Sequence, residues 1–160
     1  MEFFKKNVEL RAICAGSCAP LSEMPDEAFA SELLGRGVVF HPSSGLFFSP
    51  CDCRVESVAE TGHAVTLHTN EGAELLIHVG VDTVSLKGEG FRPLVKAGEQ
   101  VEVGTPILQA DLELIRQKGL PTATALVISN PEIAETIECR YGEVEGGHDV
   151  AILCRMARKG

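Results

Sequence analysis

Glycine and proline residues divide this sequence into short apolar runs. There are 16 glycines and 8 prolines among the 160 residues, and they are spread along the whole chain. Short runs of β-branched and aliphatic residues between turn-forming residues are typical of β-strands. The pattern therefore predicts an all-β fold, either a sandwich or a barrel. The runs are residues 37–40, 45–48, 63–69, 74–79, 100–103, 106–109, 125–128 and 150–153.

Only a few short segments have a helical pattern. Residues 26–34 and 111–118 each begin with an acidic residue and are followed by glycine, as helices commonly start and stop. Residues 130–137 could add a helical turn or two, with a proline at the first helical position. We expect these short helical turns within one domain over residues 8–160. A flexible N-terminal arm over residues 1–7 is expected to precede it.

The composition narrows the class of protein. The formal net charge is -9, which argues against a nucleic-acid partner. No apolar stretch approaches the roughly 20 residues that a membrane-spanning helix needs, and the first residues lack the apolar core of an export signal. We therefore expect a cytoplasmic protein. Its six cysteines are interpreted as free thiols, because a chain of this length can build a core without disulfides.

Two histidines, His63 and His78, flank a predicted β-hairpin within residues 61–80. A two-residue loop at residues 70–71 would place the two histidines opposite each other, with Cβ atoms roughly 5 Å apart. A three-residue loop with Gly72 left-handed is the alternative. It shifts the pairing by one residue and would place the rings on opposite faces of the sheet. The spacing alone also allows two unrelated strand histidines.

Paired imidazoles could carry out phosphoryl transfer. A neutral imidazole is a competent nucleophile near pH 7, because its unperturbed pKa is about 6.5. Attack on a phosphoryl group gives a labile phosphoramidate, and a second imidazole can donate a hydrogen bond to the phosphoryl oxygens. The sequence contains no nucleotide-binding glycine loop and no Gly-x-Ser-x-Gly nucleophile elbow. The same pair could hold zinc if a third side chain joined it, which would indicate a hydrolase.

The sequence resembles the glucose-type IIA family (EIIA type-1) of the bacterial phosphoenolpyruvate-dependent sugar phosphotransferase system. The resemblance runs from about residue 9 to residue 156. It is carried by residues 20–30, 61–64, and 74–84 continuing into 86–91. It implies an antiparallel β-sandwich with a shallow apolar depression at its active face, in which the two histidines meet.

The resemblance also implies a role for each residue of the site. His78 would be phosphorylated on Nε2, and His63 would stabilise the phosphoryl group. The Thr61 hydroxyl would orient His63. The carbonyl of Gly80 would fix the tautomer of His78 through Nδ1. No cofactor is implied, although zinc could bind adventitiously to His63 and His78.

A docking surface is implied as well. Asp26 and Asp82 would meet arginine of the histidine-containing phosphocarrier protein at the rim of the site, and Phe29, Leu76 and Val84 would form the apolar face. The second partner would be the IIB domain of a membrane sugar permease, to which the phosphoryl group passes. Regulatory docking to transporters or metabolic enzymes is an alternative or additional role for the same face.

The chain departs from the family pattern at several positions. Larger apolar residues of the docking surface are expected at the positions of Glu27, Ala59 and Thr66. These differences bear on which partner binds, and how tightly, more than on the phosphoryl-transfer chemistry. Asp52 and Cys53 replace an Asp-Gly turn. Because a left-handed backbone at a cysteine costs roughly 1 kcal/mol or more, we expect this turn to have a different type.

Overall fold

Antiparallel β-strands dominate the computed structural model, which describes residues 7–157. The strands form three sheets, in the orders β1-β14-β12, β4-β10-β8 and β13-β2-β3-β11-β7-β6-β5-β9. The predicted all-β class is therefore confirmed. The strand bounds are β1 Asn7–Arg11, β2 Gly16–Pro20, β3 Arg36–Pro42, β4 Leu46–Phe48, β5 Cys53–Val58, β6 Ala64–Thr69, β7 Glu74–Val79, β8 Phe91–Pro93, β9 Gln100–Val101, β10 Pro106–Ala110, β11 Thr124–Ile128, β12 Ala134–Cys139, β13 Gly142–Val144 and β14 Val150–Met156.

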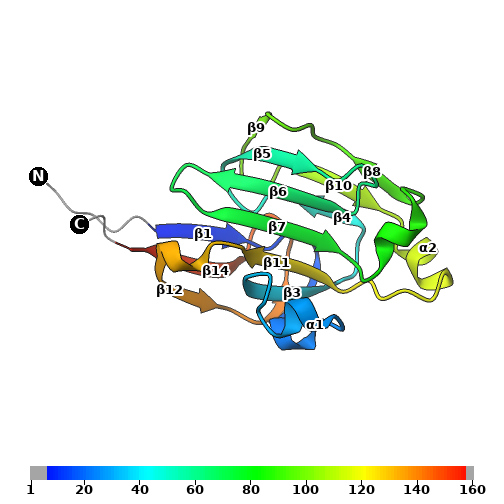
Figure 1. Ribbon diagram of the computed structural model, residues 1–160, viewed down its shortest axis with the longest axis horizontal. Coiled ribbons are helices and arrows are strands. Elements are labelled where there is room, and N and C mark those ends of the chain that lie inside the picture. The colour runs from blue at the N-terminus through cyan, green and yellow to red at the C-terminus, as the bar shows by residue number, and fades with distance from the viewer. Residues whose placement is uncertain (1–6, 158–160) are drawn as a thin grey trace, which may run out of the picture.

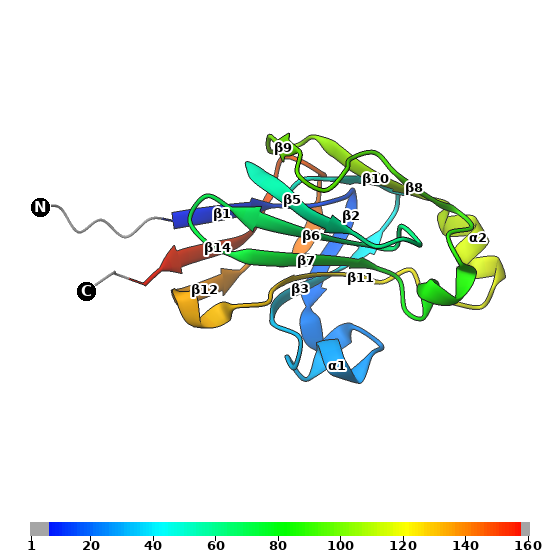
Figure 2. The ribbon, with the colours of Figure 1, turned by 45° about the horizontal axis from the view of Figure 1, so that its top comes forward.

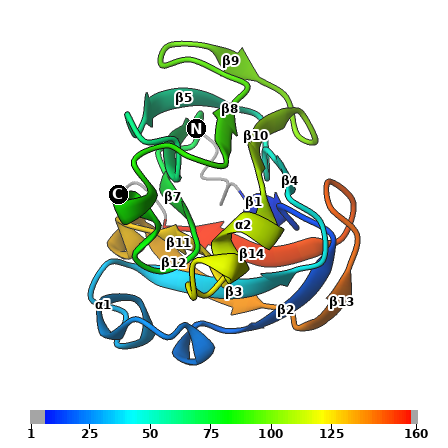
Figure 3. The same ribbon diagram turned by 90° about the vertical axis from the view of Figure 1, so that its right-hand side faces the viewer.

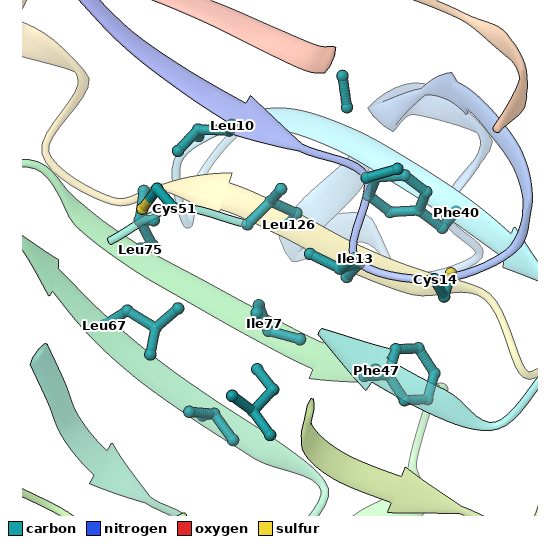
Figure 4. Close-up of a cluster of buried hydrophobic side chains, with 14 of the residues drawn as sticks. Leu10, Ile13, Cys14, Phe40, Phe47, Cys51, Leu67, Leu75, Ile77 and Leu126 are labelled. Carbon is teal, nitrogen blue, oxygen red and sulfur yellow. The ribbon is translucent and has the colours of Figure 1, made fainter. Parts of the chain in front are cut away.

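The sheets enclose one main hydrophobic core. Figures 1 and 2 show β1 and β14 running alongside the long sheet, and Figure 3 looks along the molecule so that the strands surround a common interior. Fully buried side chains from separate strands meet there, including Phe40, Phe47, Leu67, Ile77 and Leu126 (Figure 4). Each buried side chain of this size contributes about 1.5–3 kcal/mol to folding.

The alternation of side chains along β6 and β7 decides which residues remain accessible. Val65 and Leu67 of β6 are buried, as are Leu75 and Ile77 of β7, while the intervening residues are half-buried on the outer face. His78 belongs to that outer set. The hairpin is thus fixed to the core by one face and presents His78 on the other.

Within residues 7–157, five short helical segments connect the strands. They are the 3-10 turns η1 (Leu21–Glu23), η2 (Thr83–Leu86) and η3 (Pro131–Ile133), and the helices α1 (Glu27–Ala30) and α2 (Leu112–Gln117). The helix predicted over residues 111–118 is confirmed as α2. The Asp111 carboxylate caps it by accepting a hydrogen bond of 3.0 Å from the Leu114 amide.

Two helical predictions need correction. The helix expected over residues 26–34 ends at Ala30, because Glu32 has a left-handed backbone with φ of 64° and Leu33 has no apolar surface to pack against, being 79% exposed. The turns expected over residues 130–137 stop at Ile133. The following residues form β12, where pairing with β14 overrides the local helical preference.

The remaining expectations concern cysteines, membranes and the arm. All six cysteines are free thiols, as predicted, and Cys53 begins β5 without a left-handed backbone, so the Asp52–Cys53 turn differs from an Asp-Gly turn. Within the described residues, no helix has the length and apolar character needed to cross a membrane. Of the arm expected over residues 1–7, Asn7 is the first residue of β1, and the others lie outside the described residues.

Candidate functional site

The loop between β6 and β7 sets the register of the histidine-bearing hairpin. Ala64 is paired with His78, and the Thr69 amide donates to the Ala73 carbonyl at 2.9 Å. The loop therefore has three residues and ends at Gly72, whose φ is +101°. The two-residue loop, with His63 directly opposite His78, is wrong, and the three-residue alternative is correct.

The two imidazoles nevertheless meet on one face. His63 precedes the first residue of β6 and follows Gly62, whose φ is +74°, so it escapes the alternation of the regular strand. The ring centroids of His63 and His78 are 5.0 Å apart, with the ring planes at 80°. The Val79 amide donates to the His63 carbonyl at 2.8 Å and anchors this residue beside the end of β7. The expected consequence of the three-residue loop, rings on opposite faces, is therefore wrong.

The tautomer of His78 follows from its backbone partner. Nδ1 of His78 lies 2.9 Å from the carbonyl oxygen of Gly80. Because a carbonyl only accepts hydrogen bonds, Nδ1 must be the donor and carry the proton. The lone pair of the neutral ring is thus on Nε2. The Phe29 ring lies against the other side of the imidazole, with centroids 5.2 Å apart.

His63 is held between a hydroxyl and an aromatic ring. Its Nδ1 lies 2.6 Å from Thr61 Oγ1, the hydroxyl that the family resemblance pairs with it. The Phe91 ring, at a centroid distance of 6.5 Å, packs edge-on against the imidazole. Sequence reasoning assigned no role to Phe91, since it is distant in sequence from His63 and no local spacing marks it.

The residues expected to form the docking surface differ in how far they are exposed. Asp26 caps α1, where its carboxylate accepts from the Ala28 amide at 3.0 Å, and Asp82 precedes η2 with a left-handed φ of 59°. Phe29 is buried, Leu76 is half-buried against the same apolar cluster, and Val84 is 55% exposed. Val84 is thus accessible to a partner, Leu76 is partly accessible, and Phe29 is covered.

Comparison with known proteins identifies the family. The model of the family described as "phosphoenolpyruvate-dependent sugar phosphotransferase system, EIIA 1" matches residues 8–133. The chain belongs to this family. It is therefore a phosphocarrier of the glucose-type EIIA kind in sugar uptake, and the expected family and function are confirmed.

Individual members of the EIIA 1 family are similar over most of the chain. The glucose-specific EIIA component of Borreliella burgdorferi is 34% identical over 147 residues, covering 91% of this chain and 78% of that protein. The glucose-specific EIIBCA component of Corynebacterium glutamicum is 42% identical over 139 residues, or 87% of this chain, and this chain spans about a fifth of its length. The structure of glucose permease IIA from Mycoplasma capricolum superposes with a TM-score of 0.85 at 33% identity, covering 95% of this chain and 99% of that one.

Burial keeps both imidazoles of this EIIA-family site neutral near pH 7. The pKa of His78 is lowered by burial, against the opposing effects of the Gly80 carbonyl and the carboxylates of Asp26 and Asp82. The pKa of His63 is lowered by burial and by the charge that His78 would carry if protonated. A neutral His78 has its Nε2 lone pair available for attack.

The two imidazoles alone make an incomplete metal site. A structural or catalytic zinc ion takes at least three protein ligands, usually imidazole, thiolate or carboxylate. Within residues 7–157, no group of three or more such side chains is placed to hold a metal ion. The arrangement is two adjacent imidazoles, of which His78 has the lone pair of its neutral ring on Nε2.

Proposed function

We propose that His78 accepts a phosphoryl group on Nε2 from the histidine-containing phosphocarrier protein and passes it to the IIB domain of a sugar permease. The observation that carries this proposal is the hydrogen bond of 2.9 Å from His78 Nδ1 to the Gly80 carbonyl, which leaves the lone pair on Nε2. The second imidazole lies beside that ring, with centroids 5.0 Å apart.

In the transfer step, the Nε2 lone pair of His78 forms a bond to phosphorus while the P–N bond of the donor phosphohistidine breaks. The electron pair of the broken bond stays on the donor imidazole. Positive charge that develops on the His78 ring is offset at Nδ1, because the N–H donates more strongly to the Gly80 carbonyl. Nucleophile and leaving group are both imidazoles, so no metal or nucleotide cofactor is needed.

His63 stabilises the phosphoryl group during transfer. When the Thr61 hydroxyl bonds to Nδ1, the Nε2 N–H of His63 is free to donate to a phosphoryl oxygen. A protonated His63 would keep this arrangement, donating to Thr61 from Nδ1 and to the phosphoryl group from Nε2. Removing one preorganised donor of this kind typically costs on the order of 10²–10³ in rate.

Docking uses Val84 and Leu76 as the apolar contact, with Phe29 packed against the His78 ring and Asp26 and Asp82 as the charged rim. The net charge of -9 suits a cationic partner such as the arginine-bearing phosphocarrier. That a relative is an EIIBCA component supports IIB as the acceptor. Both reactions take place in the cytoplasm.

The test is labelling with phosphoenolpyruvate and the two general phosphotransferase proteins. We expect label on His78 alone, lost in acid and stable in base, as a phosphoramidate is. His78→Ala should abolish acceptance. Label that persists in His78→Ala, or that resists acid, would refute the assignment of the nucleophile.

His63→Gln separates the roles of the two histidines. Glutamine keeps an N–H donor but cannot carry positive charge, so acceptance should be slower and transfer to IIB should fall further. Single-turnover rates of each half-reaction measure both effects. Parental rates in both half-reactions would show that His63 does not act on the phosphoryl group.

A further inference from the structure

A buried hydroxyl group holds the end of β7. This group has no part in the phosphoryl-transfer step proposed above. Thr83, the first residue of η2, is fully buried, and its Oγ1 donates to the Val79 carbonyl at 2.5 Å. The N–H of the same peptide group, on Gly80, donates to the Ala123 carbonyl at 3.0 Å. The Val79–Gly80 peptide plane is therefore held at both edges.

The next peptide plane carries the carbonyl that faces the nucleophile. The Gly80 carbonyl accepts from His78 Nδ1 at 2.9 Å, and the Val81 N–H on the same plane donates to the Pro121 carbonyl at 3.2 Å. Gly80 joins the two planes with φ of +77°. Because glycine has wide conformational freedom, the direction of its carbonyl depends on how firmly the preceding plane is held.

Thr83 also restricts Gly80 through its methyl group. A Cβ built on Gly80 would lie 2.4 Å from Thr83 Cγ2, so the methyl occupies the space beside the glycine. The hydroxyl and the methyl of one side chain thus act on adjacent residues, Val79 and Gly80. Val79 is in turn bonded through its N–H to the His63 carbonyl, which links the same strand end to the second imidazole.

We propose that Thr83 is a positioning residue for phosphoryl transfer, whose hydroxyl keeps the Gly80 carbonyl directed at His78 Nδ1. This inference rests on the proposed role of His78 as the nucleophile. Without the hydroxyl, the Val79–Gly80 plane is held only through the Gly80 N–H and the next plane only through the Val81 N–H, so the Gly80 carbonyl is directed less firmly at the ring. An unrestrained neutral imidazole carries its proton mainly on Nε2, which removes the lone pair that attacks phosphorus.

The test compares Thr83→Val with Thr83→Ser. Valine keeps the shape of the side chain without the hydroxyl, and serine keeps the hydroxyl without the methyl. The ¹⁵N chemical shifts of the His78 ring report its tautomer, and single-turnover labelling reports acceptance. We expect Thr83→Val to move proton population from Nδ1 to Nε2 and to slow acceptance on the order of 10²-fold, a loss that a misplacement of about 1 Å can cause. Thr83→Ser should retain the parental tautomer.

Thr69→Val is the matched control. Thr69 is equally buried, and its hydroxyl accepts from the Ala73 amide at the far end of the same hairpin. Thr69→Val should lower stability and leave the His78 tautomer unchanged. Thr83→Ala, which removes both groups without adding bulk, is measured in parallel in case the valine variant does not fold.

The outcomes distinguish this inference from the function on which it rests. An unchanged His78 tautomer in folded Thr83→Val or Thr83→Ala overturns the inference, as does an equal loss of rate in Thr69→Val. The tautomer is measured without any phosphoryl donor. Absence of label on His78 in the parent chain would refute the proposed function, while the spectra still decide whether Thr83 sets the tautomer.

Discussion

Gly80→Ala tests whether the strand end beside His78 is as closely packed as the structure indicates. The substitution adds one methyl group at a backbone with φ of +77°. That methyl would lie 2.4 Å from Thr83 Cγ2 and 2.9 Å from the Pro121 carbonyl oxygen, well inside van der Waals contact. Two separate costs are therefore expected.

The first cost is conformational, and the second is steric. A left-handed backbone costs an L-residue about 1–2 kcal/mol. Overpacking a closed site typically costs about 1–3 kcal/mol more. The sum predicts that Gly80→Ala lowers the free energy of unfolding by about 2–5 kcal/mol. Gly119→Ala separates the two, because Gly119 has a nearly identical φ of +75° with nothing within 4 Å of the added Cβ. The free energy of unfolding of Gly119→Ala should therefore fall only by the conformational cost of about 1–2 kcal/mol.

Urea denaturation followed by circular dichroism measures both variants. Combining Gly80→Ala with Thr83→Ser removes the colliding methyl and should recover part of the loss, with a coupling of about 0.5–3 kcal/mol between the two sites. Equal losses in Gly80→Ala and Gly119→Ala, or additive behaviour of the double variant, would refute the steric argument.

Three further predictions concern charge and capping. Because burial lowers the pKa of His78, the acceptance rate should decline with falling pH at a midpoint below 6.5, the ordinary value for histidine, as Nε2 becomes protonated. A midpoint at or above 6.5 would contradict this. Asp82→Asn removes a carboxylate that raises this pKa, so the decline should move to lower pH, and acceptance should slow more at low salt than at high salt. Unchanged rates at both salt concentrations would show that Asp82 does not contribute to docking. Asp111→Ala deletes the cap of α2 and should lower unfolding free energy by about 1 kcal/mol in thermal or urea unfolding, and a neutral effect would rule out that cap.

The apolar strands were predictable because their signal is local. All eight apolar runs identified in the sequence coincide with or overlap observed strands. Strands such as β5 and β12 were not predicted because they contain no continuous apolar run, since charged residues such as Arg54 and Glu138 occupy their exposed positions. They form because neighbouring strands supply hydrogen-bond partners, which no short window of sequence reveals.

The contacts within the site were expected from the family resemblance and not from local pattern. Thr61 lies within hydrogen-bond distance of His63, and His78 of the Gly80 carbonyl. The loop register did not follow from local pattern, because residues 70–72 suit either loop length. The rings meet through the turn at Gly62, which takes His63 out of strand alternation. This departure depends on contacts with β7, so the periodicity of the sequence could not predict it.

The pairing of β1 with β14 determines how the domain would behave on a tether. Asn7 lies opposite Arg155, so the described chain enters and leaves at adjacent points. β7 runs toward the opposite end of the molecule, where it carries His78 as its penultimate residue (Figures 1 and 2). A flexible linker attached at either end would therefore not obstruct the imidazole pair. The length of that linker would set the local concentration of the reactive ring at a neighbouring protein.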